Sequence, residues 1–225
     1  SISASGHKFG ESCIGTGWVV WRQRENLSDH VAISVSYLGG MGESYNLNFS
    51  RPASGIYVQY YKFLRYGISG YQKICEHMMA HAQKIRGGLE GMKFEGKPRF
   101  VILDDGDKGC LPVVTAMLNP ECNFEYDDID LQHAISEHNW YVSGYRMNFE
   151  DPVTKQDKPI FTDQDGSKTM FRIVVKSNIN SVMVDNLIDS FGKTLEMLDS
   201  IEFKNKTNGA FKGMHRKKNL FSKHC

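Results

Sequence analysis

The chain has 225 residues, of which 40% are hydrophobic and 24% charged, and its formal net charge is +1. This composition allows a buried core and excludes a disordered chain, and the near-zero charge gives no overall field that would attract nucleic acid or a membrane surface. No apolar run approaches the roughly 20 residues of a membrane-spanning helix, so we expect no membrane span.

The cysteines are scattered and show no CxxC spacing: Cys13, Cys75, Cys110, Cys122 and Cys225. This distribution argues against a zinc site and against a disulfide framework, because both need cysteines at fixed spacings or in pairs. A reducing, cytoplasmic location is the simplest interpretation.

The first fifty residues predict strands joined by glycine-rich loops. Residues 17–22 are apolar, β-branched and aromatic, which predicts a buried strand. Residues 33–37 and 45–49 alternate polar with apolar side chains, and this pattern is typical of half-buried strands. The glycines in residues 39–42 predict a flexible loop between these two strands.

Residues 54–87 predict a helical segment. Its apolar side chains follow the spacing i, i+4, i+7 and i+8 and form a stripe made of Ile56, Tyr60, Phe63 and Leu64. Two glycines, Gly67 and Gly70, interrupt this pattern. We therefore expect two helices or one bent helix.

The remaining sequence predicts a small α+β domain followed by a tail. We expect strands at residues 99–103, 111–118, 140–147 and 170–175, and helices at residues 127–137 and 180–198. Either Asp127 or Asp128 is suited to cap the first of these helices. The buried face of the second is marked by Val184, Leu187, Ile188, Phe191, Leu195 and Leu198. Strands and helices mixed in this order suit an α+β domain, and residues 204–225 are basic and poorly periodic.

One lysine near the start of the chain lies in a setting suited to chemistry. Lys8 follows His7 and lies between Gly6 and Gly10, and small neighbours allow a flat ring to approach the backbone. A lysine whose pKa is lowered by its surroundings is a nucleophilic amine that can attach a carbonyl cofactor. A His-Lys pair alone is more often an exposed surface pair, so its wider context decides.

Five segments, in order and at matching spacing, resemble glutamate decarboxylases of the group II pyridoxal-phosphate-dependent decarboxylase family. They are Ser-Ile-Ser-Ala-Ser-Gly-His-Lys-Phe-Gly at the start, Gly-Trp-Val-Val-Trp-Arg (17–22), Tyr-Leu-Gly-Gly (37–40), Asn-Phe-Ser-Arg-Pro (48–52) and Gln-Tyr-Tyr-Lys-Phe-Leu-Arg (59–65). The resemblance is weaker after residue 71 and reappears at residues 171–174. Several ordered motifs together are far more specific than the His-Lys pair alone.

The resemblance implies an α/β protein of the fold-type I class of pyridoxal-phosphate-dependent transferases. It implies that residues 1–75 are the C-terminal part of the large cofactor domain, residues 76–203 the small α+β C-terminal domain, and residues 204–225 a basic tail. It further implies pyridoxal 5'-phosphate as cofactor, L-glutamate as substrate and a homodimer or higher homo-oligomer. The implied reaction is that of a carboxy-lyase, which converts L-glutamate to 4-aminobutyrate and carbon dioxide.

The family's functional residues carry over to five positions. Lys8 matches the lysine that binds the cofactor covalently, and His7 matches a neighbour that helps to hold the cofactor phosphate. Ser50 matches a serine that reaches the phosphate in the other subunit. Tyr37 matches a tyrosine on the loop that covers the active site and helps to protonate the product carbon. Arg172 matches the arginine that pairs with the substrate α-carboxylate by a two-pronged contact.

Each of three assignments also has a structural interpretation. Tyr37 alone would be read as an aromatic residue at the end of a strand. Ser50, which precedes Arg51-Pro52, would be read as a turn residue. Arg172 lies in an apolar strand and would be expected to pair with a structural carboxylate.

The basic tail allows three interpretations. Its apolar and basic side chains are interleaved, a pattern found in segments that bind calmodulin, and plant-type glutamate decarboxylases carry such a segment. Ser222-Lys223-His224 instead resembles the end of bacterial enzymes, in which a penultimate histidine closes the active site as pH rises, so His224 is a candidate pH gate. A solvated tail without a function is at least as consistent with the sequence.

No metal site is expected. His77 and His81 lie one helical turn apart without an evident third ligand, so a solvated helix face is the better interpretation. Residues 104–107 resemble part of a calcium loop but lack the distal glutamate, which favours a simple turn.

The largest departure from the family is what precedes Lys8. In the family, the aspartate that faces the pyridine nitrogen, the group stacked on the ring and the γ-carboxylate site all come before the catalytic lysine. Because only seven residues precede Lys8, we expect the chain to be part of a larger protein. The alternatives are a related decarboxylase of another amino acid and an inactive partial chain that serves as a dimerisation module.

Overall fold

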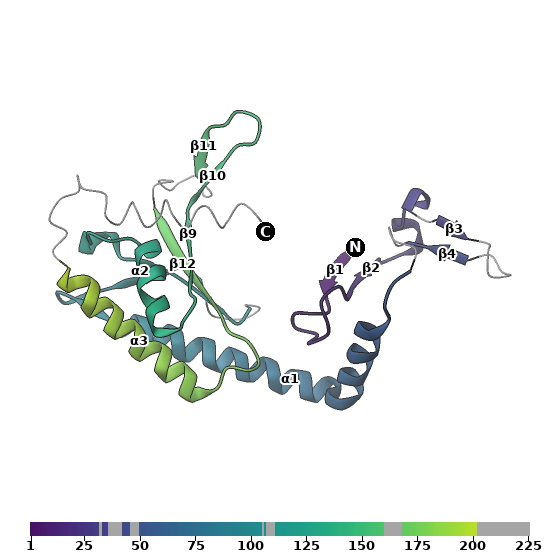
Figure 1. The fold of residues 1–225 in the computed structure, drawn as a ribbon, viewed down its shortest axis with the longest axis horizontal. Coiled ribbons are helices and arrows are strands. Elements are labelled where there is room, and N and C mark those ends of the chain that lie inside the picture. The colour runs from purple at the N-terminus through teal and green to yellow at the C-terminus, as the bar shows by residue number, and fades with distance from the viewer. Residues whose placement is uncertain are drawn as a thin grey trace. The chain divides into compact units, whose positions relative to one another are not determined.

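The computed structural model describes residues 1–31, 33–35, 42–45, 50–104, 106, 111–159 and 168–201. Two compact units make up the chain, residues 1–74 and residues 75–225. The division falls inside the long helix α1 (Ser54–Glu90), which contributes its first part to one unit and its second part to the other (Figure 1).

The first unit contains two short hairpins and the first part of α1. Strands β1 (Ile2–Ser5) and β2 (Gly17–Val20) pair antiparallel, with Ile2 opposite Val20 and Ser5 opposite Gly17. Strands β3 (Ile33–Val35) and β4 (Gly42–Ser44) form the second antiparallel pair. Two 3₁₀ turns lie between the hairpins, η1 (Arg24–Asn26) and η2 (Asp29–Val31).

The predicted strand at residues 17–22 is present as β2, but the prediction that it is buried is wrong. Val19 and Val20 are 48% and 60% exposed, because β2 belongs to a sheet of only two strands. Trp18 is better covered, since its ring stacks on that of Phe63 at 5.7 Å. The pattern of apolar side chains therefore predicted the strand but not its burial.

The second hairpin differs from expectation in its boundaries. The strand expected at residues 33–37 is described as β3, and β4 begins at Gly42, inside the expected glycine loop. Residues 46–49 of the third expected strand lie outside the described residues. Strand β1 was not expected, since three of its four residues are serine or alanine and give little strand signal.

The expectation of one bent helix is confirmed for α1. Gly67 has φ 57° and ψ −169°, which is not helical, whereas Gly70 stays within the helix. Only glycine adopts this backbone conformation without strain, because it has no Cβ. The apolar stripe expected on the first part of α1 is exposed rather than buried, with exposed fractions of 46–69% for Phe63, Tyr60, Ile56 and Leu64.

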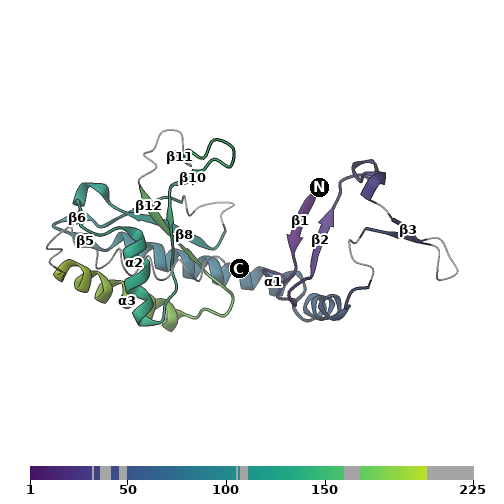
Figure 2. The same ribbon diagram turned by 45° about the horizontal axis from the view of Figure 1, so that its top comes forward.

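The second unit is built on a four-stranded antiparallel sheet in the order β7-β8-β12-β9. These strands are β7 (Phe100–Ile102), β8 (Val113–Leu118), β9 (Ser143–Arg146) and β12 (Thr169–Val174). Figure 2 labels the two central strands, β8 and β12. Because β8 and β9 are both antiparallel to β12, they run parallel to each other. Helix α2 (Asp128–Ile135) connects them across β12, which makes a split β-α-β unit.

The other elements of this unit are short, apart from helix α3 (Ser181–Ser200). Two small hairpins pair β5 (Lys93–Phe94) with β6 (Lys97–Pro98) and β10 (Asn148–Glu150) with β11 (Asp157–Pro159). Two 3₁₀ turns are η3 (Pro120–Cys122) and η4 (Ser136–His138). The expected helices and strands of the α+β domain are thus all described, with Asp127 as the N-cap of α2.

One face of the sheet is buried and the other is open. Along β12, Thr169, Phe171 and Ile173 are buried, while Arg172 and Val174 are exposed, as expected where successive side chains point to opposite faces. The ring of Phe171 lies 5.6 Å from that of Phe191 in α3. The expected buried face of α3 is confirmed except at Ile188, which is only half-buried.

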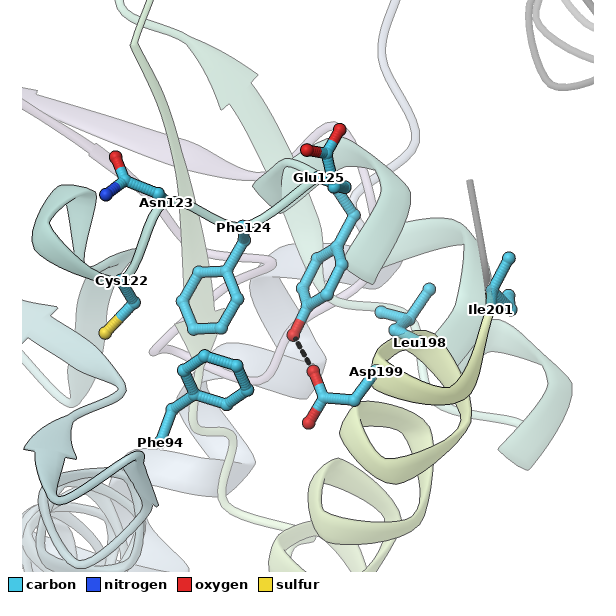
Figure 3. Close-up of a pocket in the computed structure, with 9 residues that line it drawn as sticks. Phe94, Cys122, Asn123, Phe124, Glu125, Leu198, Asp199 and Ile201 are labelled. Carbon is cyan, nitrogen blue, oxygen red and sulfur yellow. Dashed lines mark hydrogen bonds between the residues drawn. The ribbon is translucent and has the colours of Figure 1, made fainter. Parts of the chain in front are cut away.

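A buried arginine joins α3 to the loops at one edge of this unit. Arg99 donates to both carboxylate oxygens of Asp199, at 3.1 and 2.6 Å, and its guanidinium lies 4.9 Å from the ring of Phe94 and 5.3 Å from that of Phe124. Phe94, Phe124 and Asp199 also line a cavity of about 160 Å³ (Figure 3). Ligand pockets usually start at ~300 Å³, so we interpret this cavity as structural.

Asp128, the first residue of α2, ties three elements together from a buried position. Its carboxylate accepts hydrogen bonds from the N–H of Leu118 at the end of β8 and from the hydroxyl of Thr169 at the start of β12, each 2.8 Å long. Burial raises the pKa of Asp128 to about 6, although both hydrogen bonds oppose the shift. The carboxyl therefore binds its proton more tightly in the folded chain than in the unfolded chain.

This raised pKa predicts how the second unit responds to pH. An acid whose folded pKa lies above its unfolded pKa stabilises the fold at low pH and loses that contribution as pH rises through the folded value. As pH rises from about 4 to about 7, the loss of this contribution should lower the free energy of unfolding by on the order of 3 kcal/mol. Urea unfolding of the parent and of Asp128→Asn at several pH values measures the difference, and parallel curves would contradict the prediction.

Candidate functional site

The connection from β1 to β2 carries Lys8 on a tightly bonded loop. The N–H of Gly6 donates to the carbonyl of Thr16 at 2.8 Å, and the N–H of Ser12 donates to the carbonyl of Gly6 at 2.9 Å. The carbonyl of Lys8 itself accepts the N–H of Glu11 at 3.0 Å. These bonds fix the backbone around Lys8 while its side chain remains exposed.

The first part of α1 holds this loop in place at Gly10. Gln59 donates from Nε2 to the carbonyl of Gly10 at 2.8 Å, and the hydroxyl of Tyr71 lies 3.4 Å from the same carbonyl. The ring of Tyr71 also lies 5.4 Å from that of Phe9, the residue after Lys8. Helix and loop are therefore joined by hydrogen bonds and by an aromatic contact.

Two further contacts hold the other end of the loop. The hydroxyl of Ser12 donates to the carbonyl of Gly55 at 2.5 Å, and the ammonium of Lys62 lies 3.0 Å from the carboxylate of Glu11. The hydrogen bond to Glu11 raises the pKa of Lys62, which keeps this lysine charged. Gly55 is buried, and a methyl group there would overlap the hydroxyl of Thr16, so only glycine allows the helix to approach this closely.

Lys8 and His7 present polar side chains that remain available for a ligand. Within the part of the chain that the structure describes, the amine of Lys8 has no carboxylate within ion-pair distance. The Nδ1 atom of His7 lies 3.4 Å from the carbonyl of Thr16. A protonated His7 can keep this contact and still donate from Nε2 to an anion.

Arg172 lies on the open face of β12, in the second unit. Its guanidinium donates to the hydroxyl of Tyr145 at 2.9 Å and lies 5.3 Å from the centre of that ring. Tyr145 is on β9, two residues beyond Ser143, which pairs with Arg172, and such diagonal neighbours share a face. The alternative that Arg172 pairs with a structural carboxylate finds no support among the described residues.

Of the three other expected site positions, the structure describes only Ser50. Ser50 is exposed and outside any helix or strand. Tyr37 lies outside the described residues, as do His224 and the basic tail from residue 204. Their roles as loop tyrosine, pH gate and calmodulin-binding segment therefore remain predictions from the sequence.

The discounted metal candidates have structural partners. His77 contacts the carbonyl of Ile179 through Nε2 at 3.1 Å, and His81 contacts the carbonyl of His77 through Nδ1 at 2.8 Å. His81 is buried, so the interpretation of both as a solvated helix face is wrong for this residue. Asp104 pairs with Arg86 and accepts the N–H of Thr115.

Comparison with known proteins explains why these residues occur together. Residues 1–96 match the model of the pyridoxal-dependent decarboxylase conserved domain. A glutamate decarboxylase from Aliivibrio fischeri is 38% identical over 188 residues, which cover 84% of this chain and 36% of that protein. Glutamate decarboxylase beta from Listeria innocua is 32% identical over 89% of this chain and 39% of its own length.

The solved structures agree with the sequence comparison. The Lactobacillus brevis glutamate decarboxylase superposes with a TM-score of 0.72 at 29% identity, over 89% of this chain and 41% of that chain. Residues 1–96 thus match the pyridoxal-dependent decarboxylase conserved domain, and the similarity to glutamate decarboxylases extends over most of the chain.

These comparisons confirm the expected fold class. A sphingosine-1-phosphate lyase from Burkholderia pseudomallei, only 14% identical, has the same fold with a TM-score of 0.62 over 99% of this chain. These neighbours belong to the fold-type I class, as the motifs predicted. The chain spans little more than a third of the length of the curated relatives, 36% for those from Aliivibrio fischeri and Petunia hybrida. No helix among the described residues is long and apolar enough to cross a membrane.

Two supporting residues were missed by the sequence reasoning. Gln59 is a polar residue among the aromatic and apolar residues of a helical segment, but its burial and its bond to Gly10 depend on a tertiary contact. Tyr145 gave no comparable signal, because its contact with Arg172 depends on strand register. Both residues lie beside predicted functional positions rather than at them.

The close approach at Gly10 predicts a mutational effect on the loop. A methyl group at Gly10 would lie 2.7 Å from the carbonyl oxygen of Gly6, and backbone atoms cannot move aside as a flexible side chain can. Gly10→Ala should therefore open the loop and speed trypsin cleavage after Lys8 by roughly fivefold or more, since cleavage follows the population of the open form. Gly87→Ala, where the methyl meets no atom within 4 Å, is the control, and equal cleavage rates would refute the effect.

Proposed function

We propose that this chain is the lysine-bearing part of a pyridoxal-phosphate-dependent decarboxylase that converts L-glutamate to 4-aminobutyrate and carbon dioxide. The observation that carries the proposal is the fastened loop that presents Lys8 without a carboxylate partner among the described residues. The proteins named glutamate decarboxylase that match most of this chain support L-glutamate as substrate.

The residues around Lys8 fit a cofactor that combines an aldehyde with a phosphate. Lys8 offers an exposed amine for covalent attachment, and an ion pair would hinder such attachment by keeping the amine protonated. His7 offers an imidazole donor, and Ser50 an exposed hydroxyl, that can contact a phosphate. When bound, pyridoxal phosphate supplies the electron sink that decarboxylation needs.

We assign Arg172 to the α-carboxylate of the substrate. A guanidinium presents a planar fork of N–H donors that matches a carboxylate in two places. Tyr145 restrains the guanidinium through a hydrogen bond and through its ring, which reduces the freedom lost when a carboxylate binds. Holding the carboxylate at two points also sets the direction of the bond that breaks.

Tyr37 and His224 complete the proposal on the sequence resemblance alone. A tyrosine hydroxyl on a glycine-flanked loop is suited to deliver the proton to the substrate carbon while the loop excludes water. An imidazole changes charge near neutral pH, so His224 is suited to respond to pH.

We further propose that the protein is a homodimer or higher homo-oligomer in the cytoplasm. The first part of α1 exposes a row of large apolar side chains, which includes Ile56, Tyr57, Tyr60, Tyr61 and Leu64. Contiguous apolar surfaces of this kind usually mark contacts between proteins. The same face favours the second candidate function, a dimerisation module without activity. Cys13, Cys75 and Cys122 are free thiols, consistent with a reducing compartment.

The role of Lys8 can be tested directly. The purified protein with pyridoxal phosphate should show a visible absorption band that disappears on borohydride reduction, and peptide mapping should locate the adduct on Lys8. Lys8→Ala should lose the band and the turnover of glutamate, whereas Lys73→Ala, at another exposed lysine, should retain both. A protein that dimerises but shows no band and no product would support the inactive module. Preferential turnover of aspartate or of aromatic amino acids would show that glutamate is not the substrate.

The role of Arg172 predicts a specific kinetic change. Arg172→Lys keeps the charge but removes the two-pronged contact, so we expect KM for glutamate to rise by roughly tenfold or more. Tyr145→Phe removes only the hydrogen bond that restrains the guanidinium and should raise KM less. Arg146→Lys changes an exposed arginine on the neighbouring strand and serves as the control. An Arg172→Lys variant with unchanged KM would remove Arg172 from the substrate site.

A further inference from the structure

We propose that Gln59 is a positioning residue, which fixes the loop that presents Lys8 by seating its amide against Gly6 and Gly10. The inference concerns the geometry of the loop, and its consequence for cofactor attachment rests on the proposed function of Lys8. Gln59 contacts the backbone of the loop at Gly10, so it acts on Lys8 only through the loop.

The amide of Gln59 is enclosed between the two glycines that flank Lys8. The residue is only 3% exposed, and its Nε2 donates to the carbonyl of Gly10 at 2.8 Å. A methyl group at Gly6 would lie 2.9 Å from Oε1 of Gln59, and one at Gly10 would lie 2.7 Å from the same oxygen. The two glycines thus make room for this amide, and Lys8 lies midway between them in sequence.

Burial of the Gln59 amide has a free-energy cost, because one of its polar atoms loses water without gaining a partner among the described residues. In the described part of the chain, Oε1 of Gln59 is buried without a hydrogen-bond partner. A buried acceptor without a partner is unfavourable by comparison with an apolar side chain of the same shape. The donor of the same amide offsets this cost, because Nε2 fixes the backbone two residues after Lys8.

The contacts around Gly10 show how the effect reaches Lys8. Gln59 and Tyr71 both contact the carbonyl of Gly10, and the next residue, Glu11, donates its N–H back to the carbonyl of Lys8. Releasing the Gly10 carbonyl therefore loosens the turn that Lys8 begins. The amides of Glu11 and Ser12, whose hydrogen bonds close this turn, report its opening.

The experiment compares Gln59→Leu and Gln59→Glu with a matched control. Gln83 lies on the same helix and makes the same type of bond, from Nε2 to the carbonyl of Gly106 at 2.6 Å. Gln83→Leu removes this bond far along the helix, together with the bond that Gln83 accepts from Arg86 at 2.7 Å. Hydrogen exchange at Glu11 and Ser12 measures loop opening without any cofactor. We expect Gln59→Leu to lower protection there on the order of tenfold, the loss expected for one buried hydrogen bond, and Gln83→Leu to leave it unchanged.

Gln59→Glu distinguishes positioning from packing, because it keeps the shape of the side chain. An ionised carboxylate cannot donate to the Gly10 carbonyl, whereas a protonated carboxyl can. Protection at Glu11 and Ser12 in this variant should match Gln59→Leu at neutral pH and return toward the parent value as pH falls. This return also keeps the test informative if Gln59→Leu fails to fold.

A second measurement links the loop to the amine. Borohydride reduction with pyridoxal phosphate, followed by peptide mapping, should show a lower ratio of adduct on Lys8 to adduct on Lys73 in Gln59→Leu than in the parent. Exchange protection that is the same in all variants would overturn the positioning inference. A parent protein with no preference for Lys8, but with the expected exchange changes, would instead overturn the proposed function and leave the positioning of the loop established.

Discussion

The site depends on one constraint, the close approach of helix α1 to the loop that carries Lys8. Gly55 of the helix and Gly6 and Gly10 of the loop are buried, and a methyl group at any of them would meet atoms at or below 3 Å. At this separation Gln59 of the helix donates to the carbonyl of Gly10 in the loop, and Ser12 of the loop donates to the carbonyl of Gly55 in the helix. The loop can therefore be rigid although it carries an exposed amine, because its backbone and not the amine is fixed.

The interruption of α1 at Gly67 serves the same constraint. In an unbroken helix, residues five apart point in directions that differ by about 140°, since each residue turns the helix by about 100°. With Gly67 at φ 57°, the rings of Tyr66 and Tyr71 meet at 5.5 Å, and Tyr71 reaches the Gly10 carbonyl that Gln59 also contacts. The kink thus brings two turns of the helix onto one short loop.

Local patterns in the sequence predicted the elements better than their environment. The strands β2, β8 and β12, the bent helix α1 and the N-cap at Asp127 follow from side-chain spacing, glycine positions and capping chemistry. Burial in the first unit did not follow, because apolar spacing shows which face is apolar and not what covers it. Lys8 and Arg172 were found by motif, whereas Gln59 and Tyr145 depend on tertiary contacts that no local pattern encodes.

Two cations that hold elements together differ in their partners from Lys8 and Arg172, the two cations proposed for the site. Lys62 and Arg99 hold elements together, and each has a carboxylate partner, Glu11 and Asp199. Among the described residues, Lys8 and Arg172 have no such partner, and Arg172 is restrained by the neutral hydroxyl and ring of Tyr145. A carboxylate beside either cation would compete with an anionic ligand and, at Lys8, would favour the protonated amine that cannot attack a carbonyl. At Arg172, the neutral side chain of Tyr145 restrains the guanidinium and leaves its charge free for an anion.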